Sequence, residues 1–133
     1  MVNMEISPDL VNAIIEHAHA FDVKEAETDP DSGSNPTDDG DLDVLQDTPG
    51  DLTGADLRAV IEALNVDQAA ELVALMWIGR GEYDGQEWAH AVKRARERAT
   101  GPTSRYLMGV PMLGDYLQDG LQAVLDAGVR DDA

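Results

Sequence analysis

The sequence of 133 residues contains no cysteine. This absence excludes disulfide bonds, zinc sites with thiolate ligands and catalysis by a thiol. It also leaves the redox compartment undetermined, because there is no thiol to oxidise. The first ten residues, MVNMEISPDL, lack the basic start and the continuous apolar stretch of a signal peptide, so we expect a cytoplasmic protein.

Basic residues are scarce, with nine Lys and Arg against 27 Asp and Glu, which gives a formal net charge of −18. A charge of this size repels nucleic acid and anionic lipid surfaces, and it favours solubility, cations or basic partners. We therefore expect neither nucleic acid nor a membrane as the partner of this chain.

Long apolar runs are also missing. The longest run, Leu72 to Ile78, has seven residues, far fewer than the ~20 residues that a membrane span needs. A helix over this run is apolar at every angle, so it must be covered on all sides. We predict that residues 66–78 form the central helix of a small bundle, which begins after a capping Asn65 and is broken by Gly79-Arg80-Gly81.

Apolar residues recur at helical spacing in four further segments. We expect helices over 8–24, 54–64, 85–99 and 111–127, with a short helical turn at 103–108. In the last helix Gly120 lies on the inward face, which requires a closely packed neighbouring helix. No stretch shows the period-two alternation of strands. The prediction is an all-α single domain, residues 1–133, built as a compact bundle of about five helices.

One acidic segment separates the first two predicted helices. Asp22 to Asp56 contains twelve acidic residues and one basic residue, a local net charge of −11. It has too little apolar surface to offset the entropy lost on ordering, so we expect a flexible acidic loop over 25–52. Leu42, Val44, Leu45 and Leu52 are apolar exceptions that either dock a short turn on the bundle or bind a partner. At the other end, we expect 129–133 to be a frayed tail.

Six of the nine basic residues lie between Arg80 and Arg105, where the local net charge is +2. These cations either complement a helix dipole and pair with the acidic loop, or form a binding face for an acidic protein or a phosphate. In the first case the loop would cover the face around Arg94, Arg98 and Arg105. Arginines and phenols bind anions well, and the candidate binding residues are Arg80, Tyr83, Arg94, Arg98, Arg105 and Tyr106.

Two Glu-x-x-His pairs, Glu16/His19 and Glu87/His90, have the spacing used by dimetal bundles. Both pairs lie far from the apolar faces of their predicted helices, so they point to water. We expect no metal and no cofactor. No positioned nucleophile or tuned base is apparent, and no catalytic residue is assigned.

The motifs LVALMWIGRG, from Leu72, and RYLMGVPMLGDYL, from Arg105, resemble a small family of bacterial proteins described only as a domain of unknown function. The resemblance extends to ISPDLVNAIIEHAHAF near the start of the chain. It implies a compact helical domain in the bacterial cytosol. It implies no activity, cofactor or catalytic residue.

These observations favour a non-enzymatic helical module that interacts with another protein or regulates it, with an acidic loop and a basic helix face. The alternative is a small-anion-binding protein or an enzyme with a pocket at the helix ends near Arg80 and Arg105. A pocket where the arginines and tyrosines converge would favour the alternative. The predicted 85–99 helix has alanines along one side, and this side could also pack against a second copy of the chain in a homodimer.

Overall fold

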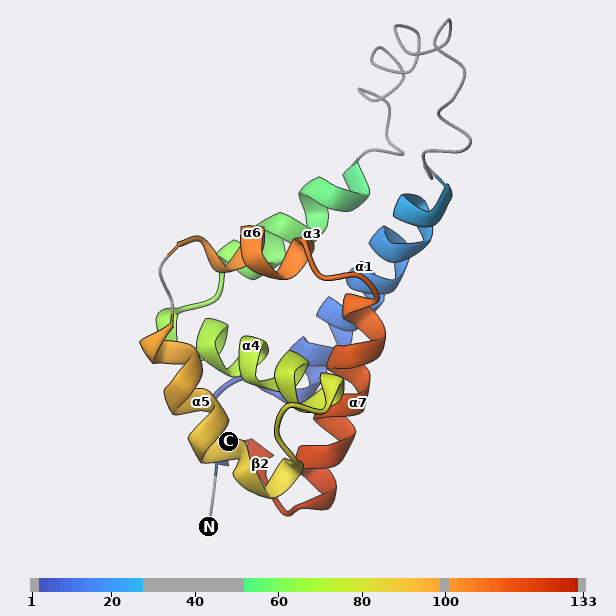
Figure 1. The fold of residues 1–133 in the computed structure, drawn as a ribbon. Coiled ribbons are helices and arrows are strands. Elements are labelled where there is room, and N and C mark those ends of the chain that lie inside the picture. The colour runs from blue at the N-terminus through green and yellow to red at the C-terminus, as the bar shows by residue number, and fades with distance from the viewer. Residues whose placement is uncertain (1–2, 28–51, 99–100, 132–133) are drawn as a thin grey trace, which may run out of the picture.

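The computed structural model describes residues 3–27, 52–98 and 101–131, which form an all-α bundle as predicted (Figure 1). Its α-helices are α1 (Pro8–Glu27), α3 (Leu52–Glu62), α4 (Val66–Arg80), α5 (Trp88–Glu97), α6 (Thr103–Met108) and α7 (Leu113–Asp126). A 3-10 helix, η4 (Gly85–Glu87), precedes α5, and two short strands, β1 (Asn3–Met4) and β2 (Arg130–Asp131), lie near the chain ends. None of the helices in these ranges is long and apolar enough to cross a membrane.

Helix α4 lies at the centre of the bundle, between α7 and α5, as Figure 1 shows. Every residue from Ala70 to Ile78 is buried, which confirms the prediction of a helix covered on all sides. The predicted cap is also present. The Asn65 side chain accepts a hydrogen bond from the Gln68 backbone N–H, and the Gln68 side chain accepts one from the Asn65 N–H. At the other end Gly81 adopts the left-handed conformation, with φ 96°.

Helices α4 and α7 cross at glycines. A Cβ atom at Gly120 would overlap the carbonyl oxygen of Leu75, and one at Gly79 would overlap that of Tyr116. The close neighbour expected from Gly120 is therefore α4. The helix ends within the predicted Gly79-Arg80-Gly81 sequence, at Gly81. Gly79 itself is still helical and provides the close contact with α7.

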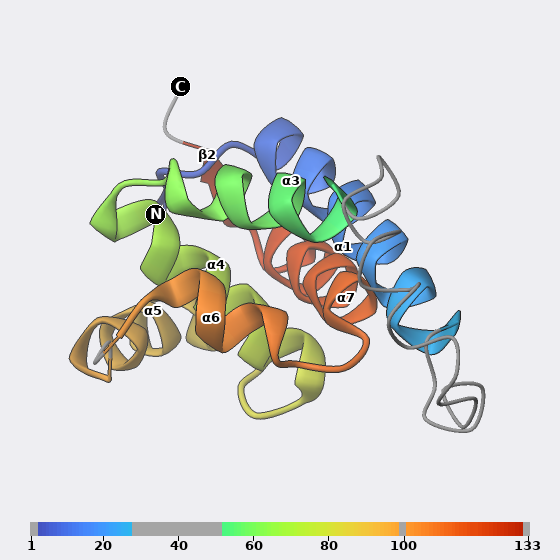
Figure 2. The ribbon, with the colours of Figure 1, turned by 90° about the horizontal axis from the view of Figure 1, so that it is seen from above.

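The remaining helices close the bundle. Helix α1 packs on α7 and α3, and α3 packs on α6, as the view from above shows (Figure 2). The inward residues of α1 and α5 are apolar at helical spacing. The buried ones are Val11, Ile14, Ile15 and Ala18 in α1, and Trp88, Ala91, Val92 and Ala95 in α5. The short turn expected at 103–108 is α6.

The two ends of the described chain meet. β1 pairs in parallel with β2, in the register Asn3 with Arg130 and Met4 with Asp131. Val129 is only 3% exposed, so the prediction of a frayed tail is wrong for residues 129–131. Two-residue strands show no periodicity in sequence. Met4 in β1 and Ile6 just after it are both buried in the core.

The range 25–52 expected for the acidic loop overlaps helical residues at both ends, because α1 continues to Glu27 and α3 begins at Leu52. Residues 28–51 lie outside the described residues. The expected docking of Leu42, Val44 and Leu45, and the expected covering of the basic face by this segment, lie outside them as well.

Candidate functional site

One cavity of about 790 Å³ opens between α3, α4, α5 and α6. Such a volume is within the range of ~300–1,000 Å³ that is usual for ligand pockets. Its wall is mainly apolar, with a small number of polar groups. The lining residues are Ile61, Glu62, Leu64, Asn65, Val66, Ala69, Ala70, Val73, Trp77, Ala95, Arg96, Arg98 and 101–106.

A single face of α4 forms the floor. Val66, Ala69, Ala70, Val73 and Trp77 recur three or four residues apart, which places them along one side of the helix. Trp77 is 6% exposed, whereas Val66, at the start of the helix, is 79% exposed. The apolar surface therefore continues from the buried floor to the outside of the molecule.

Three arginines line the cavity. Arg96 forms an ion pair with Asp67, with 2.7 Å between Nη2 and Oδ1. Arg98, the C-cap residue of α5, and Arg105, in α6, form no ion pair with any described residue. Within the described part of the chain, the cavity thus has two guanidinium groups whose charge no carboxylate neutralises.

Two lining residues of α6, Tyr106 and Ser104, form side-chain hydrogen bonds with the neighbouring helices. The indole Nε1–H of Trp77 donates a hydrogen bond of 2.9 Å to the Tyr106 hydroxyl. The hydroxyl of Ser104, which is 3% exposed, donates one of 3.0 Å to Glu62 Oε2. These bonds fix α6 against α4 and α3 and orient the polar groups of the wall.

The structure separates the six candidate binding residues. Arg98, Arg105 and Tyr106 line the cavity, whereas Arg94 lies outside it and pairs with Glu97 at 3.5 Å. Arg80 donates a hydrogen bond from Nε to Glu82, 2.6 Å away, and this bond raises the pKa of the guanidinium above its usual value. Tyr106 adds to that rise, so Arg80 lies near Tyr106, although Arg80 itself does not line the cavity.

Tyr83 also lies outside the cavity. Its ring is 5.9 Å from that of Trp77 and 5.6 Å from that of His90, measured between centroids. Of the three arginines of the predicted basic face, Arg98 and Arg105 line the cavity and Arg94 does not.

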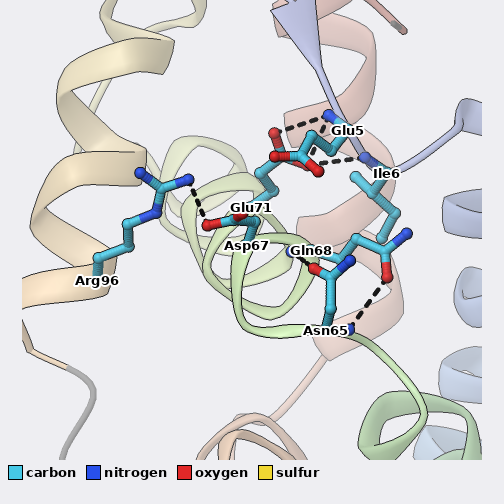
Figure 3. Close-up of polar contacts among 7 residues, drawn as sticks. All are labelled: Glu5, Ile6, Asn65, Asp67, Gln68, Glu71 and Arg96. Carbon is cyan, nitrogen blue, oxygen red and sulfur yellow. Dashed lines mark hydrogen bonds and ion pairs between the residues drawn. The ribbon is translucent and has the colours of Figure 1, made fainter. Parts of the chain in front are cut away.

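A second polar cluster lies near the start of α4 (Figure 3). Glu71, 4% exposed, accepts hydrogen bonds of 2.8–2.9 Å from the backbone N–H groups of Glu5 and Ile6. Burial raises the pKa of this carboxyl, and the two N–H groups oppose the rise. Glu71 thus attaches the N-terminal segment to α4, and neither Glu71 nor the two residues that donate to it line the cavity.

The Glu-x-x-His pairs do not come together. Glu16 and His90 are exposed, and Glu87 accepts from the Asp84 N–H in the capping box that begins η4. His19 Nε2 lies 3.0 Å from Asp115 Oδ1. Among the described residues, no group of three or more His, Asp or Glu side chains could hold a metal ion.

Sequence reasoning did not identify the cavity residues Glu62, Val66, Trp77, Arg96 and Ser104. The spacing of Val66, Val73 and Trp77 indicates a shared face of α4, but not that the face opens to solvent. Ser104 directly precedes two of the predicted binding residues, Arg105 and Tyr106. This adjacency is the one feature of the sequence that indicates α6 as part of the cavity wall.

Residues 54–125, more than half of the chain, match the sequence model of a family described as "Protein of unknown function (DUF3775)". The match runs from α3 to α7 and includes both motifs and every residue that lines the cavity. It excludes α1 and the two strands. No curated protein and no solved structure matches the chain.

Proposed function

The chain belongs to the DUF3775 family, whose description assigns no function, and from the geometry of the cavity we propose that the protein is a non-enzymatic binding module. Its ligand is a segment of a partner protein that carries both apolar and acidic side chains. The single observation that carries this proposal is the cavity itself, an apolar floor beside two arginines that form no ion pair with any described residue.

A protein partner is supported by the apolar surface at the mouth of the cavity. Val66 and Tyr106, two cavity residues, are large hydrophobic side chains that are 79% and 44% exposed. A small ligand inside the cavity would leave Val66 in water, whereas a longer segment would cover it. Tyrosine, tryptophan and arginine are also the side chains that dominate protein interfaces energetically.

The charge of the site supports an acidic segment. Arg98 and Arg105 are exposed and line the same wall, and a guanidinium can hold a carboxylate with two parallel hydrogen bonds. The remainder of the chain is strongly acidic, so this arginine pair is a local exception. Attraction between a carboxylate and these arginines must therefore act at short range.

The lining groups support binding better than catalysis. Among the described residues that form the cavity wall there is no histidine, cysteine or lysine. Ser104 donates to Glu62, and no third group in the wall orients that carboxylate. The wall thus holds a hydroxyl beside a carboxylate, but among the described lining residues it lacks the group that would orient that carboxylate as the base in acyl or phosphoryl transfer.

A small organic anion is the second candidate ligand, and the volume of the cavity favours it. About 790 Å³ accommodates a molecule of metabolite size, and two arginines with the Tyr106 hydroxyl would hold its anionic group. For either ligand, the resemblance to bacterial proteins supports a role in the bacterial cytoplasm.

The test uses two double variants of the tagged full-length protein with the same change in charge. Arg98→Glu/Arg105→Glu reverses the cavity arginines, and Lys93→Glu/Arg94→Glu reverses two exposed cations of α5 outside the cavity. We expect a partner captured from a lysate of the source cells to bind the purified wild type and the Lys93/Arg94 variant equally. Binding to the Arg98/Arg105 variant should be at least tenfold weaker.

Trp77 provides the control for location. It lines the cavity, whereas Trp88 is 2% exposed on the core face of α5, so a segment in the cavity should change the emission of Trp77 alone. A partner that binds both variants equally, with no change in emission, would contradict the proposal. Recovery of only a small anion would favour the second candidate.

A further inference from the structure

The cavity wall offers both donors and acceptors of hydrogen bonds. An indole N–H is only a donor, so the Tyr106 oxygen accepts from Trp77 and its own O–H hydrogen is directed elsewhere. Ser104 uses its hydrogen on Glu62, which leaves the lone pairs of Ser104 Oγ and the second oxygen of Glu62 as acceptors. A complementary ligand therefore presents N–H donors as well as an anionic group.

On the premise of the proposed function, we infer that the bound segment is an extended peptide with an acidic side chain and at least one available backbone N–H. The acidic side chain lies between Arg98 and Arg105, and the N–H donates to Ser104 Oγ or Glu62. A large apolar side chain covers Val73 and Trp77. All these groups belong to the same cavity.

The acceptors argue against a helical segment and against a simple amphipathic carboxylate. In the interior of a helix each N–H is bonded to a carbonyl of the same helix, so it cannot donate to Ser104. An alkyl carboxylate has no N–H group and would cover the buried Ser104 hydroxyl without supplying a donor, which is unfavourable for a buried polar atom. An extended peptide meets both requirements.

The arginines define the position of the acidic side chain. Arg96 already pairs with Asp67, so Arg98 and Arg105 are the arginines of the described wall that remain for a ligand carboxylate. Both are at the α5–α6 side of the cavity. Trp77 and Val73 are on α4, so the apolar side chain follows or precedes the acidic one in the peptide.

The experiment selects ligands for the full-length protein from a display library of random heptapeptides. We expect selected peptides to combine Asp or Glu with Leu, Ile, Phe or Trp one or two positions away. Changing the acidic residue of the best peptide to its amide should weaken binding to the wild type about tenfold. The same change should have little effect on binding to Arg98→Glu/Arg105→Glu.

Backbone recognition is tested by methylating each N–H of that peptide in turn. One position should lose about tenfold in affinity on the wild type and clearly less on Ser104→Ala. Octanoate, a carboxylate without N–H groups, should bind at least tenfold more weakly than the peptide.

The outcomes separate the inference from the proposed function. Selected peptides that lack acidic residues, tolerate every methylation, or bind no better than octanoate would overturn the inference. If such peptides still changed Trp77 emission and competed with the captured partner, the proposed function would stand. A library that yields no peptide sensitive to Arg98→Glu/Arg105→Glu, together with a partner that is equally insensitive, would overturn both.

Discussion

Glu71 is a carboxylate buried in the most apolar helix of the molecule. One of its oxygens, Oε1, accepts from both the Glu5 and the Ile6 N–H, at 2.9 and 2.8 Å. These donors belong to the segment that continues β1, whose Met4 is fully buried. A single side chain therefore joins the N-terminal segment to the centre of the bundle.

Replacing Glu71 tests this role. Glu71→Ala should lower the free energy of unfolding by about 2–4 kcal/mol, because two N–H groups lose their acceptor inside the protein. Glu71→Gln should cost less than about 1 kcal/mol, since its amide oxygen can still accept from both groups. Urea unfolding measures both values. Equal losses for the two variants would mean that the hydrogen bonds are not the source of the stability.

At the same scale, sequence reasoning identified some site residues and not others. Arg98, Arg105 and Tyr106 were predicted because their side-chain chemistry suits anions. Arg94 was predicted for the same reason, but it lies outside the cavity. Side-chain chemistry is local information, whereas membership of a cavity depends on how α3, α4, α5 and α6 pack, and no single segment encodes that.

The positions of the helices follow from local signals. Asn65, predicted as a cap from the sequence, begins α4 through a capping box, and Asp84 begins η4 in the same way. Apolar spacing predicted α1, α5 and α7 to within a few residues at each end. The pairing of β1 with β2 could not be predicted in this way, because it joins residues more than 120 positions apart.

The crossing of α4 and α7 depends on glycine. At Gly120 a methyl group would overlap the Leu75 carbonyl, so Gly120→Ala must push the two helices apart. We expect the free energy of unfolding to fall by about 2–4 kcal/mol, which thermal or urea unfolding would detect.

Gly101→Ala is the matched control for this crossing. Gly101 is exposed, and a Cβ atom added there meets no described atom within 4 Å. Its effect should be within about 0.5 kcal/mol. A Gly120→Ala variant as stable as this control would show that the helices can separate without loss.

The whole molecule carries a large excess of negative charge, −18 in total. The ion pairs of the described residues are exposed, namely Arg80–Glu82, Arg94–Glu97, Arg96–Asp67 and the pair of His19 with Asp115. Exposed pairs contribute little, commonly below about 1 kcal/mol each. Repulsion between carboxylates therefore opposes the compact state. The cost to the stability of the folded state is greatest where a carboxylate is also removed from water.

Two carboxyl groups are in that situation, and they determine how stability depends on pH. Burial raises the pKa of Glu71, and it raises that of Asp22 against the opposing hydrogen bond from the Gly114 N–H. A raised pKa means that the folded state binds the proton more tightly than the unfolded state. The stability gained by protonation is thus complete below the unfolded-state pKa values, and it is lost as the pH rises through the folded-state values.

The Tm should consequently increase by about 2–5 °C between pH 7.5 and pH 5, helped by weaker repulsion across the surface. The variant Asp22→Asn/Glu71→Gln should show a smaller increase, because both side chains keep their acceptor oxygens but no longer titrate. Raising the salt concentration at pH 7.5 screens surface repulsion alone, so it should raise the Tm of both proteins equally. An identical pH profile for the two proteins would assign the whole effect to surface charge and none to the buried carboxyls.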